Sequence, residues 1–154
     1  MDTGLGNSAY LIGSHATKKG ILIDPLRDVD RYLHAASELG IQLTHVLDTH
    51  LHADFVSGNL EIANQTRAII GATAEAKAGF DHQPLTEDSV IDLGAFQIRV
   101  MTTPGHTPEH ISYLLVKPDG KTPSALFSGG ALIVGGAART DLLSHEMTHP
   151  LASH

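Results

Sequence analysis

Short apolar stretches bounded by turn-forming residues constrain the fold of this chain more than any other feature of its sequence. The stretches that predict strands are Ser8 to Ile12, Ile21 to Ile23, His45 to Asp48, Ala68 to Ile70, Val90 to Leu93, Phe96 to Met101, Ile111 to Val116 and Ala125 to Ser128. The stretches that predict helices are Asp28 to Leu39, which Asp28 is placed to cap, Ser57 to Thr66, and the first part of Ala72 to Gln83. Because strands and helices are mixed and some strands form hairpins, the sequence predicts an α/β or α+β layered domain.

The length and charge of the chain narrow the classes of function. Its 154 residues suit one domain, or one domain that lacks a piece. The net charge is -7 and Lys and Arg form no cluster, so neither nucleic acid nor a membrane surface is an expected partner. No targeting segment is visible and no apolar run is long enough to cross a bilayer, which predicts a cytoplasmic protein.

The histidine and cysteine contents point to metal chemistry with nitrogen and oxygen ligands. The chain has no cysteine, which excludes disulfides, thiolate zinc sites and a cysteine nucleophile. It has 11 histidines, more than packing requires, and histidine is the commonest metal ligand in proteins. A metal site built from imidazole and carboxylate groups is therefore the first expectation.

The segment Thr49 to Asp54, THLHAD, is the sharpest local feature. It follows the predicted strand His45 to Asp48, and a side chain at a strand's end can point into a crevice. His50, His52 and Asp54 alternate, so an extended or turning backbone can aim all three to one side. Two imidazoles and a carboxylate suit zinc or iron. The simpler alternative is a polar loop in which Asp54 caps the following helix.

A second histidine-bearing segment, Thr103 to His110, TPGHTPEH, also follows a predicted strand. Pro104 and Gly105 favour a turn that leaves His106 on a loop tip, where its imidazole could be a third ligand. A third match, His145 to His149, has the zincin pattern His-Glu-x-x-His. Pro150 follows it directly and disfavours a helix there, so we expect no protease site.

Three segments together resemble the metallo-β-lactamase superfamily: THLHADFVSG at 49–58, TPGHTPEH at 103–110 and GAARTD at 136–141. They look most like its persulfide dioxygenase branch and the related, glyoxalase II-like metallo-hydrolases that are often fused to rhodanese domains. The resemblance implies an αββα sandwich, occupying residues 1–154 as a single domain whose C-terminal part is missing.

The resemblance also implies site residues. His50, His52 and His106 correspond to a three-histidine metal site, which here would hold one Fe(II) or Zn(II). Asp54 corresponds to the carboxylate that holds a second metal or orients the attacking water. Arg139 corresponds to an arginine near the substrate channel, where it could pair with a carboxylate of glutathione.

The chain departs from the family pattern in three places. Phe55 stands where the family usually has another histidine, which argues against a two-metal site. Gly130 stands where a ligand aspartate is expected, so the usual two-histidine, one-carboxylate iron site is incomplete. Either Asp54 supplies the carboxylate ligand, or His52 completes a three-histidine site that suits zinc better. His154 ends the chain inside an expected helix, which predicts an exposed sheet edge and association with another chain, either as a homo-oligomer or with a partner.

Three functions remain open on the sequence. The first is a persulfide dioxygenase-like enzyme acting on glutathione persulfide or a similar small thiol-derived substrate. The second is a zinc-dependent thioester hydrolase, in which Asp54 orients the water. The third is a catalytically degenerate module that keeps the fold and binds a rhodanese-type sulfur carrier.

Overall fold

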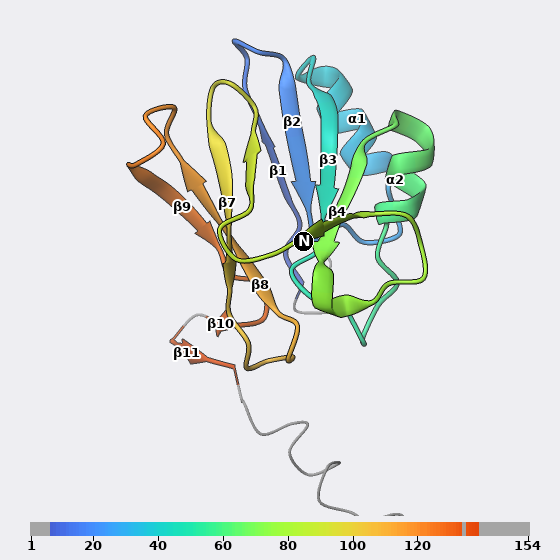
Figure 1. Ribbon diagram of the computed structural model, residues 1–154. Coiled ribbons are helices and arrows are strands. Elements are labelled where there is room, and N and C mark those ends of the chain that lie inside the picture. The colour runs from blue at the N-terminus through green and yellow to red at the C-terminus, as the bar shows by residue number, and fades with distance from the viewer. Residues whose placement is uncertain (1–6, 134, 139–154) are drawn as a thin grey trace, which may run out of the picture.

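The computed structural model describes residues 7–133 and 135–138, and two β-sheets form its centre (Figure 1). The first sheet has the order β1-β2-β3-β4-β5, with β1 antiparallel to β2 and the remaining neighbours parallel. Its strands are β1 Tyr10–Gly13, β2 Lys19–Ile23, β3 Gln42–Leu47, β4 Ile69–Thr73 and β5 Gln83–Leu85.

The second sheet is antiparallel throughout and has the order β6-β7-β8-β9. Its strands are β6 Val90–Asp92, β7 Gln97–Thr102, β8 Ile111–Val116 and β9 Pro123–Phe127. A small hairpin follows it, made of β10 Leu132–Ile133 and β11 Gly136–Ala137. The predicted strands Val90 to Leu93 and Phe96 to Met101 are confirmed as β6 and β7, which pair antiparallel in a hairpin about Gly94.

The main core lies between the two sheets. It joins side chains of the first sheet to side chains of the second: Ile21, Ile23, Leu47 and Leu85 on one side, and Ile91, Leu93, Ile98, Val100, Ile111 and Tyr113 on the other. Burying this much apolar surface is the dominant favourable contribution to folding. The sheets are therefore packed face to face.

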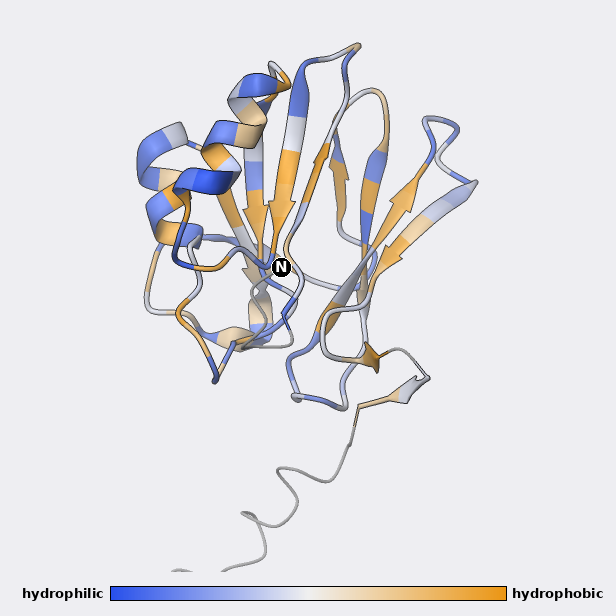
Figure 2. Cartoon of the chain, turned by 180° about the vertical axis from the view of Figure 1, so that it is seen from behind, coloured by the Kyte–Doolittle hydropathy of each residue, from blue (hydrophilic) through white to orange (hydrophobic). Residues whose placement is uncertain are grey.

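Two helices, α1 Asp30–Glu38 and α2 Asn59–Thr66, cover the other face of the first sheet (Figure 1). Their contact with the sheet is a second cluster of buried residues: Leu22, Val29, Ala36, Leu43, Val46, Ile62, Ala68 and Ile70. Figure 2 shows the hydrophilic residues of the helices turned away from the apolar strands. The described residues thus form three layers, helix, sheet and sheet, and among them no α-helix covers the outer face of the second sheet.

Two local predictions are corrected by the structure. The stretch after Ala72 forms the end of β4 and a single 3-10 turn, Ala74–Ala76, because the Thr73 side chain caps the turn and Lys77 ends it with a left-handed φ of 48°. Asp28 does not cap the first helix, which begins after Val29 without a side-chain cap. The helix expected at the end of the chain and the motif His145 to His149 lie outside the described residues.

The parallel pairing of β2 and β3 brings the residues that follow these strands to the same edge. The backbone N–H of Asp24, just after β2, donates to the carbonyl of Leu47 at 2.8 Å. The loop after β3 also meets the second sheet, because the N–H of Ile111 donates to the carbonyl of Thr49 at 2.8 Å. Neither described α-helix is long and apolar enough to cross a membrane.

Candidate metal centre

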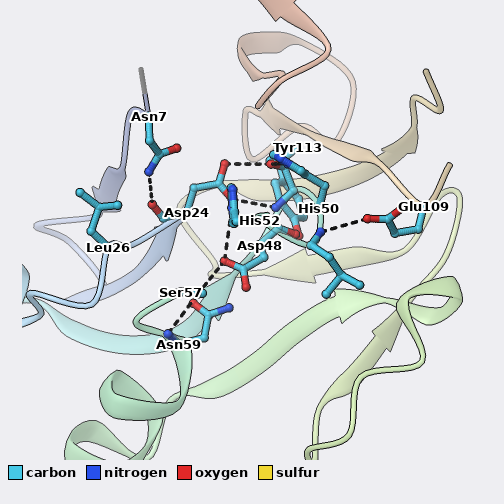
Figure 3. Close-up of polar contacts among 12 residues, drawn as sticks. Asn7, Asp24, Leu26, Asp48, His50, His52, Ser57, Asn59, Glu109 and Tyr113 are labelled. Carbon is cyan, nitrogen blue, oxygen red and sulfur yellow. Dashed lines mark hydrogen bonds and ion pairs between the residues drawn. The ribbon is translucent and has the colours of Figure 1, made fainter. Parts of the chain in front are cut away.

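The loop that carries the histidine motif is anchored to both sheets. Thr49 is fully buried, and the hydroxyl of Tyr113 on β8 donates to the carbonyl of Asp48 at 2.6 Å. On the motif's other side the N–H of Leu51 donates to Glu109 at 3.0 Å, which joins this loop to the loop between β7 and β8 (Figure 3). The two histidine-bearing loops predicted from the sequence are therefore adjacent.

The carboxylate of Asp24 holds the histidine motif in place through hydrogen bonds. It is 2% exposed, and it accepts hydrogen bonds from the N–H of Thr49 at 2.8 Å, the hydroxyl of Thr49 at 2.9 Å and Nε2 of His52 at 3.1 Å. Asp24 holds a left-handed φ of 49°, a conformation that Asp tolerates better than most residues. One buried side chain thus fixes the start of the motif and its second histidine.

These bonds determine which ring nitrogens remain free. The single hydroxyl proton of Thr49 goes to Asp24, so Thr49 Oγ1 accepts from Nδ1 of His50 at 2.9 Å, and Nε2 of His50 keeps its lone pair. His52 donates through Nε2, which leaves the lone pair on Nδ1. Neither lone pair has a partner among the described residues, so each is available to a metal, with the carboxylate and hydroxyl behind them orienting the rings.

Electrostatics keep the first of these imidazoles neutral. Burial, followed by repulsion from His52 and His110, lowers the pKa of His50 to about 4, so the ring carries no charge at pH 7. Burial also lowers the pKa of His52, but its hydrogen bond to Asp24 and the neighbouring carboxylates outweigh this effect and raise the pKa overall. Burial and the charge of Asp24 raise the pKa of Asp48 to about 7.

His106 lies at the tip of the loop between β7 and β8, where Gly105 adopts a φ of 155°. The ring of His50 is next to both other histidines, with centroid distances of 4.2 Å to His52 and 4.9 Å to His106. The described residues also include a tighter group, Asp24, Asp48 and His52, whose donor atoms lie within 4.8 Å of one another. Because both oxygens of Asp24 already accept hydrogen bonds, we assign this group to orientation of His52.

His110 is a buried neighbour of His50. It is 1% exposed, its ring stacks on that of His50 at 5.1 Å, and its Nδ1 bonds to the hydroxyl of Thr103 at 2.9 Å. Its Nε2 has no partner among the described residues. His110 directly precedes β8 in the sequence.

Two of the three departures from the family pattern, Phe55 and Gly130, lie beside the histidines. The ring of Phe55 packs 4.1 Å from that of His52, so an apolar group stands beside the histidines. At Gly130 there is no room for a side chain, since a Cβ atom built there would lie 2.3 Å from Cδ2 and 2.8 Å from Nε2 of His106. His106 thus occupies the space in front of the backbone where a carboxylate ligand was expected.

The predicted site residues open onto one cavity of about 920 Å³. His50, His52, Asp54 and His106 all line it, together with Gly130. Asp54 is exposed and belongs neither to a helix nor to a strand, so it does not cap α2, which begins after Gly58 without a side-chain cap. Arg139 lies outside the described residues.

Sequence reasoning missed the contribution of Asp24 and Thr49. Asp24 directly follows the apolar stretch Ile21 to Ile23, just as the two histidine motifs follow predicted strands. That shared position at a strand exit was the signal that could have found it. The hydrogen-bonding role of Thr49 depends on its contact with Asp24, 25 residues away, which no local pattern reveals.

The sheets, the helices on one face and the histidine loops at the sheet edge agree with a metallo-β-lactamase fold. The chain matches the metallo-beta-lactamase superfamily over residues 2–151 and belongs to that family. It is 36% identical over 130 residues to a hydroxyacylglutathione hydrolase-like protein of Mus musculus, covering 84% of this chain and 46% of the mouse protein. The human protein of the same name is 35% identical over 130 residues, covering 84% of this chain and 44% of its own length.

Solved structures similar to this chain also have the metallo-β-lactamase fold. A metallo-β-lactamase from Staphylococcus aureus has 36% identity and a TM-score of 0.81, with 89% of this chain and 43% of that chain covered. ETHE1 from Myxococcus xanthus has 38% identity and a TM-score of 0.77, with 87% and 56% covered. These neighbours fit the glyoxalase II-like and persulfide dioxygenase branch expected from the sequence. The chain spans less than half the length of the curated relatives it matches.

Proposed function

We propose that this chain is the metal-binding part of a single-metal enzyme that hydrolyses a small thioester, with zinc bound by His50, His52 and His106. The observation that carries the proposal is the donor set. His50 and His52 each have one nitrogen engaged by a hydrogen bond and one free, and His106 packs against a glycine instead of a carboxylate. A set of three imidazoles suits zinc better than iron.

A bound zinc ion would supply the Lewis acid that polarises the thioester carbonyl and activates water. The residues of the chain have separate tasks around it. Asp54 lines the same cavity as the histidines and is exposed, which supports a role for its carboxylate in accepting a hydrogen bond from the attacking water and then its proton. Asp24 holds the His52 ring in one orientation. The C–S bond breaks as the C–O bond forms, and the departing thiolate takes up a proton.

Oxidation of a persulfide by dioxygen, with one Fe(II) bound at the site, is the second candidate. The likeness to ETHE1 and the segment THLHADFVSG favour it. In that reaction the carboxylate ligand would have to come from Asp54, since Gly130 has no side chain to offer.

Metal analysis combined with two assays separates these functions. The purified chain is loaded with zinc or iron, and thiol release from a thioester is compared with oxygen uptake on glutathione persulfide. The variant His106→Ala removes one ligand, while His34→Ala, on the exposed face of α1, is the matched control. We expect about one zinc per chain and thiol release, both lost in His106→Ala only.

Two other results would change the assignment. Oxygen uptake with iron, and no thiol release with zinc, would support the persulfide reaction. Failure to retain either metal would remove both enzyme proposals and leave the module that keeps the fold without catalysis.

A further inference from the structure

Two hydrogen bonds join the histidine loops, and they lie on either side of His50. The N–H of Ile111 donates to the carbonyl of Thr49 at 2.8 Å, which holds the backbone just before this histidine. The N–H of Leu51 donates to a carboxylate oxygen of Glu109 at 3.0 Å, which holds the backbone just after it (Figure 3). His50 is therefore held on both sides by the chain that leads into β8.

The arrangement resembles a pair of residues in an antiparallel sheet. In a pair of the non-hydrogen-bonded kind, two backbone bonds flank two residues whose side chains lie close together. Here the flanked residues are His50 and His110, and their rings stack with centroids 5.1 Å apart. The bond to Thr49 joins backbone to backbone, but in the second bond the side chain of Glu109 accepts in place of a backbone carbonyl. A carboxylate thus completes the sheet pattern beside the first histidine.

The side chain of Glu109 is suited to hold a backbone N–H in place. It is partly buried, and it lies on the same loop as His106, three positions further along. Burial acts to raise the pKa of its carboxyl, but hydrogen bonds from backbone N–H groups, that of Leu51 foremost, outweigh this effect and lower the pKa. The group is therefore ionised at pH 7 and can only accept, which fixes the direction of the bond.

The position of this backbone matters for a metal because Leu51 lies between His50 and His52. A shift of its N–H would move the rings of both histidines relative to His106, which belongs to the loop on the other side of the bond. A metal ion needs its ligand atoms within about 0.2 Å of their ideal distances. The bond between Glu109 and Leu51 therefore helps to set the separation of the two loops that carry the proposed zinc ligands.

We propose that Glu109 is a positioning residue of the metal site, which holds the loop of His50 and His52 at the distance from His106 at which one zinc ion is bound. The inference rests on the proposed function for the metal and its ligands, and it adds a residue outside that ligand set. The reach of the carboxylate oxygen is what matters, since its hydrogen bond goes to the backbone of Leu51 and not to a histidine ring.

Three variants of Glu109 separate reach from charge, because zinc carries a charge of +2 that attracts any nearby carboxylate. Glu109→Gln keeps an oxygen at the same reach and removes the charge, whereas Glu109→Asp keeps the charge on a side chain about 1.5 Å shorter. Glu109→Ala removes both. In competition with a chelator, zinc affinity is expected to fall about 10- to 100-fold in Glu109→Asp and Glu109→Ala, and less than about threefold in Glu109→Gln.

The opposite ranking would overturn the proposal. If Glu109→Gln binds zinc as weakly as Glu109→Ala while Glu109→Asp binds it like the parent, the negative charge and not the hydrogen bond supports the metal. Equal zinc affinity of the parent and all three variants would show that Glu109 has no role in the site.

Amide exchange in the metal-free chain tests the bond itself. In NMR measurements, the N–H of Leu51 is expected to exchange with solvent roughly tenfold faster in Glu109→Asp and Glu109→Ala than in the parent, and Glu109→Gln should stay close to the parent. This measurement needs no bound metal, so it decides the proposal even for a variant that retains no zinc. The same exchange rate in all four proteins would overturn the proposal.

Asp92→Ala is the matched control for a lost carboxylate bond. The carboxylate of Asp92 also accepts a backbone N–H, that of Gly94 at 2.7 Å, but in the turn before β7, at the other end of this strand from the histidine loop. Its loss should leave zinc affinity within about threefold of the parent, because distant sites act independently. If Asp92→Ala weakens zinc as much as Glu109→Ala does, general loosening of the fold explains both, and the positioning role is wrong.

Thiol release distinguishes failure of this proposal from failure of the proposed function. If the zinc-loaded parent hydrolyses a thioester but the variants of Glu109 all bind zinc equally well, hydrolysis is right and the positioning role is wrong. If the expected ranking of zinc affinities is found without any thiol release, the positioning role stands and hydrolysis is wrong.

Discussion

Asp24 accepts a hydrogen bond from Nε2 of His52 at 3.1 Å across 28 positions of sequence. The same carboxylate binds the backbone and hydroxyl of Thr49, which in turn accepts a hydrogen bond from His50. Both histidines of the motif therefore depend on one buried side chain outside the motif. The orientation of their free ring nitrogens is therefore set in the metal-free chain.

Replacing Asp24 with Asn should weaken metal binding. Asn keeps the size and tolerates the left-handed backbone, but it offers an N–H₂ group where three donors now converge. We expect the zinc affinity to fall about 10- to 100-fold, as for other groups that orient metal ligands. A chelator competition titration measures it, with Asp28→Asn as control. Unchanged affinity in a folded Asp24→Asn protein would contradict the orienting role.

Adding a methyl group at Gly130 should displace His106. The new Cβ would overlap the His106 ring, so the ring must turn or the backbone must shift. We expect Gly130→Ala to bind zinc at least tenfold more weakly, again measured by chelator competition. Gly79→Ala is the matched control, because a Cβ there has no neighbour within 4 Å. Equal affinity of the two variants would show that His106 does not need its observed position.

The stability of the metal-free chain should respond to pH through Asp48. Its pKa is raised to about 7 by burial and by Asp24, so the folded state holds a proton that the unfolded state has lost. Stability contributed by this group is therefore lost as pH rises from about 4 to 7. Asp48→Asn should be more stable than the parent by roughly 1–3 kcal/mol at pH 8 and equal to it near pH 4.

Urea unfolding at several pH values, with a chelator present, measures this difference. Asp119→Asn is a control of opposite sign, because hydrogen bonds from Thr122 and Lys121 lower the pKa of Asp119 to about 2. Relative to the parent, that variant should become less stable as pH rises from about 2 to 4, because only the parent gains stability from ionisation of Asp119. A stability gain of Asp48→Asn that does not change with pH would show that packing, not titration, causes it.

Removing the hydroxyl of Tyr113 should loosen the connection between the sheets. That hydroxyl is fully buried and donates to the carbonyl of Asp48 at the end of β3. Tyr113→Phe leaves the carbonyl without this partner, and we expect unfolding free energy to fall by about 1–2 kcal/mol in urea titrations. Tyr10→Phe, at a partly exposed ring, should change it little. Equal losses in both variants would assign the effect to the rings.

The periodic elements of the fold follow from the sequence because their pattern is local. The alternation in Phe96 to Met101 and the apolar face of Asp28 to Leu39 correspond to β7 and α1. The turn after Thr73 was predicted as helix because its composition is helical. Two single residues, the capping Thr73 and the left-handed Lys77, limit it to one turn, and composition does not reveal their conformation.

The sequence predicts those parts of the site that directly follow predicted strands. His50, His52, Asp54 and His106 line the same cavity, as the two motifs suggested, although their role as metal ligands stays a prediction. Asp24 could not be linked to His52 from sequence, because the parallel pairing of β2 and β3 brings them together. The contact between Gly130 and His106 depends in the same way on packing between distant loops.

The hydrogen bond from Ile111 to Thr49 places the histidine loops at the seam between the two sheets. His50 and His52 belong to the loop after β3 in one sheet, and His106 belongs to the loop before β8 in the other. A metal ion bound by all three histidines would cross-link the two sheets. The free energy of metal binding would then add to the unfolding free energy of the whole domain. Removing the metal with a chelator would lower the temperature at which the two sheets come apart.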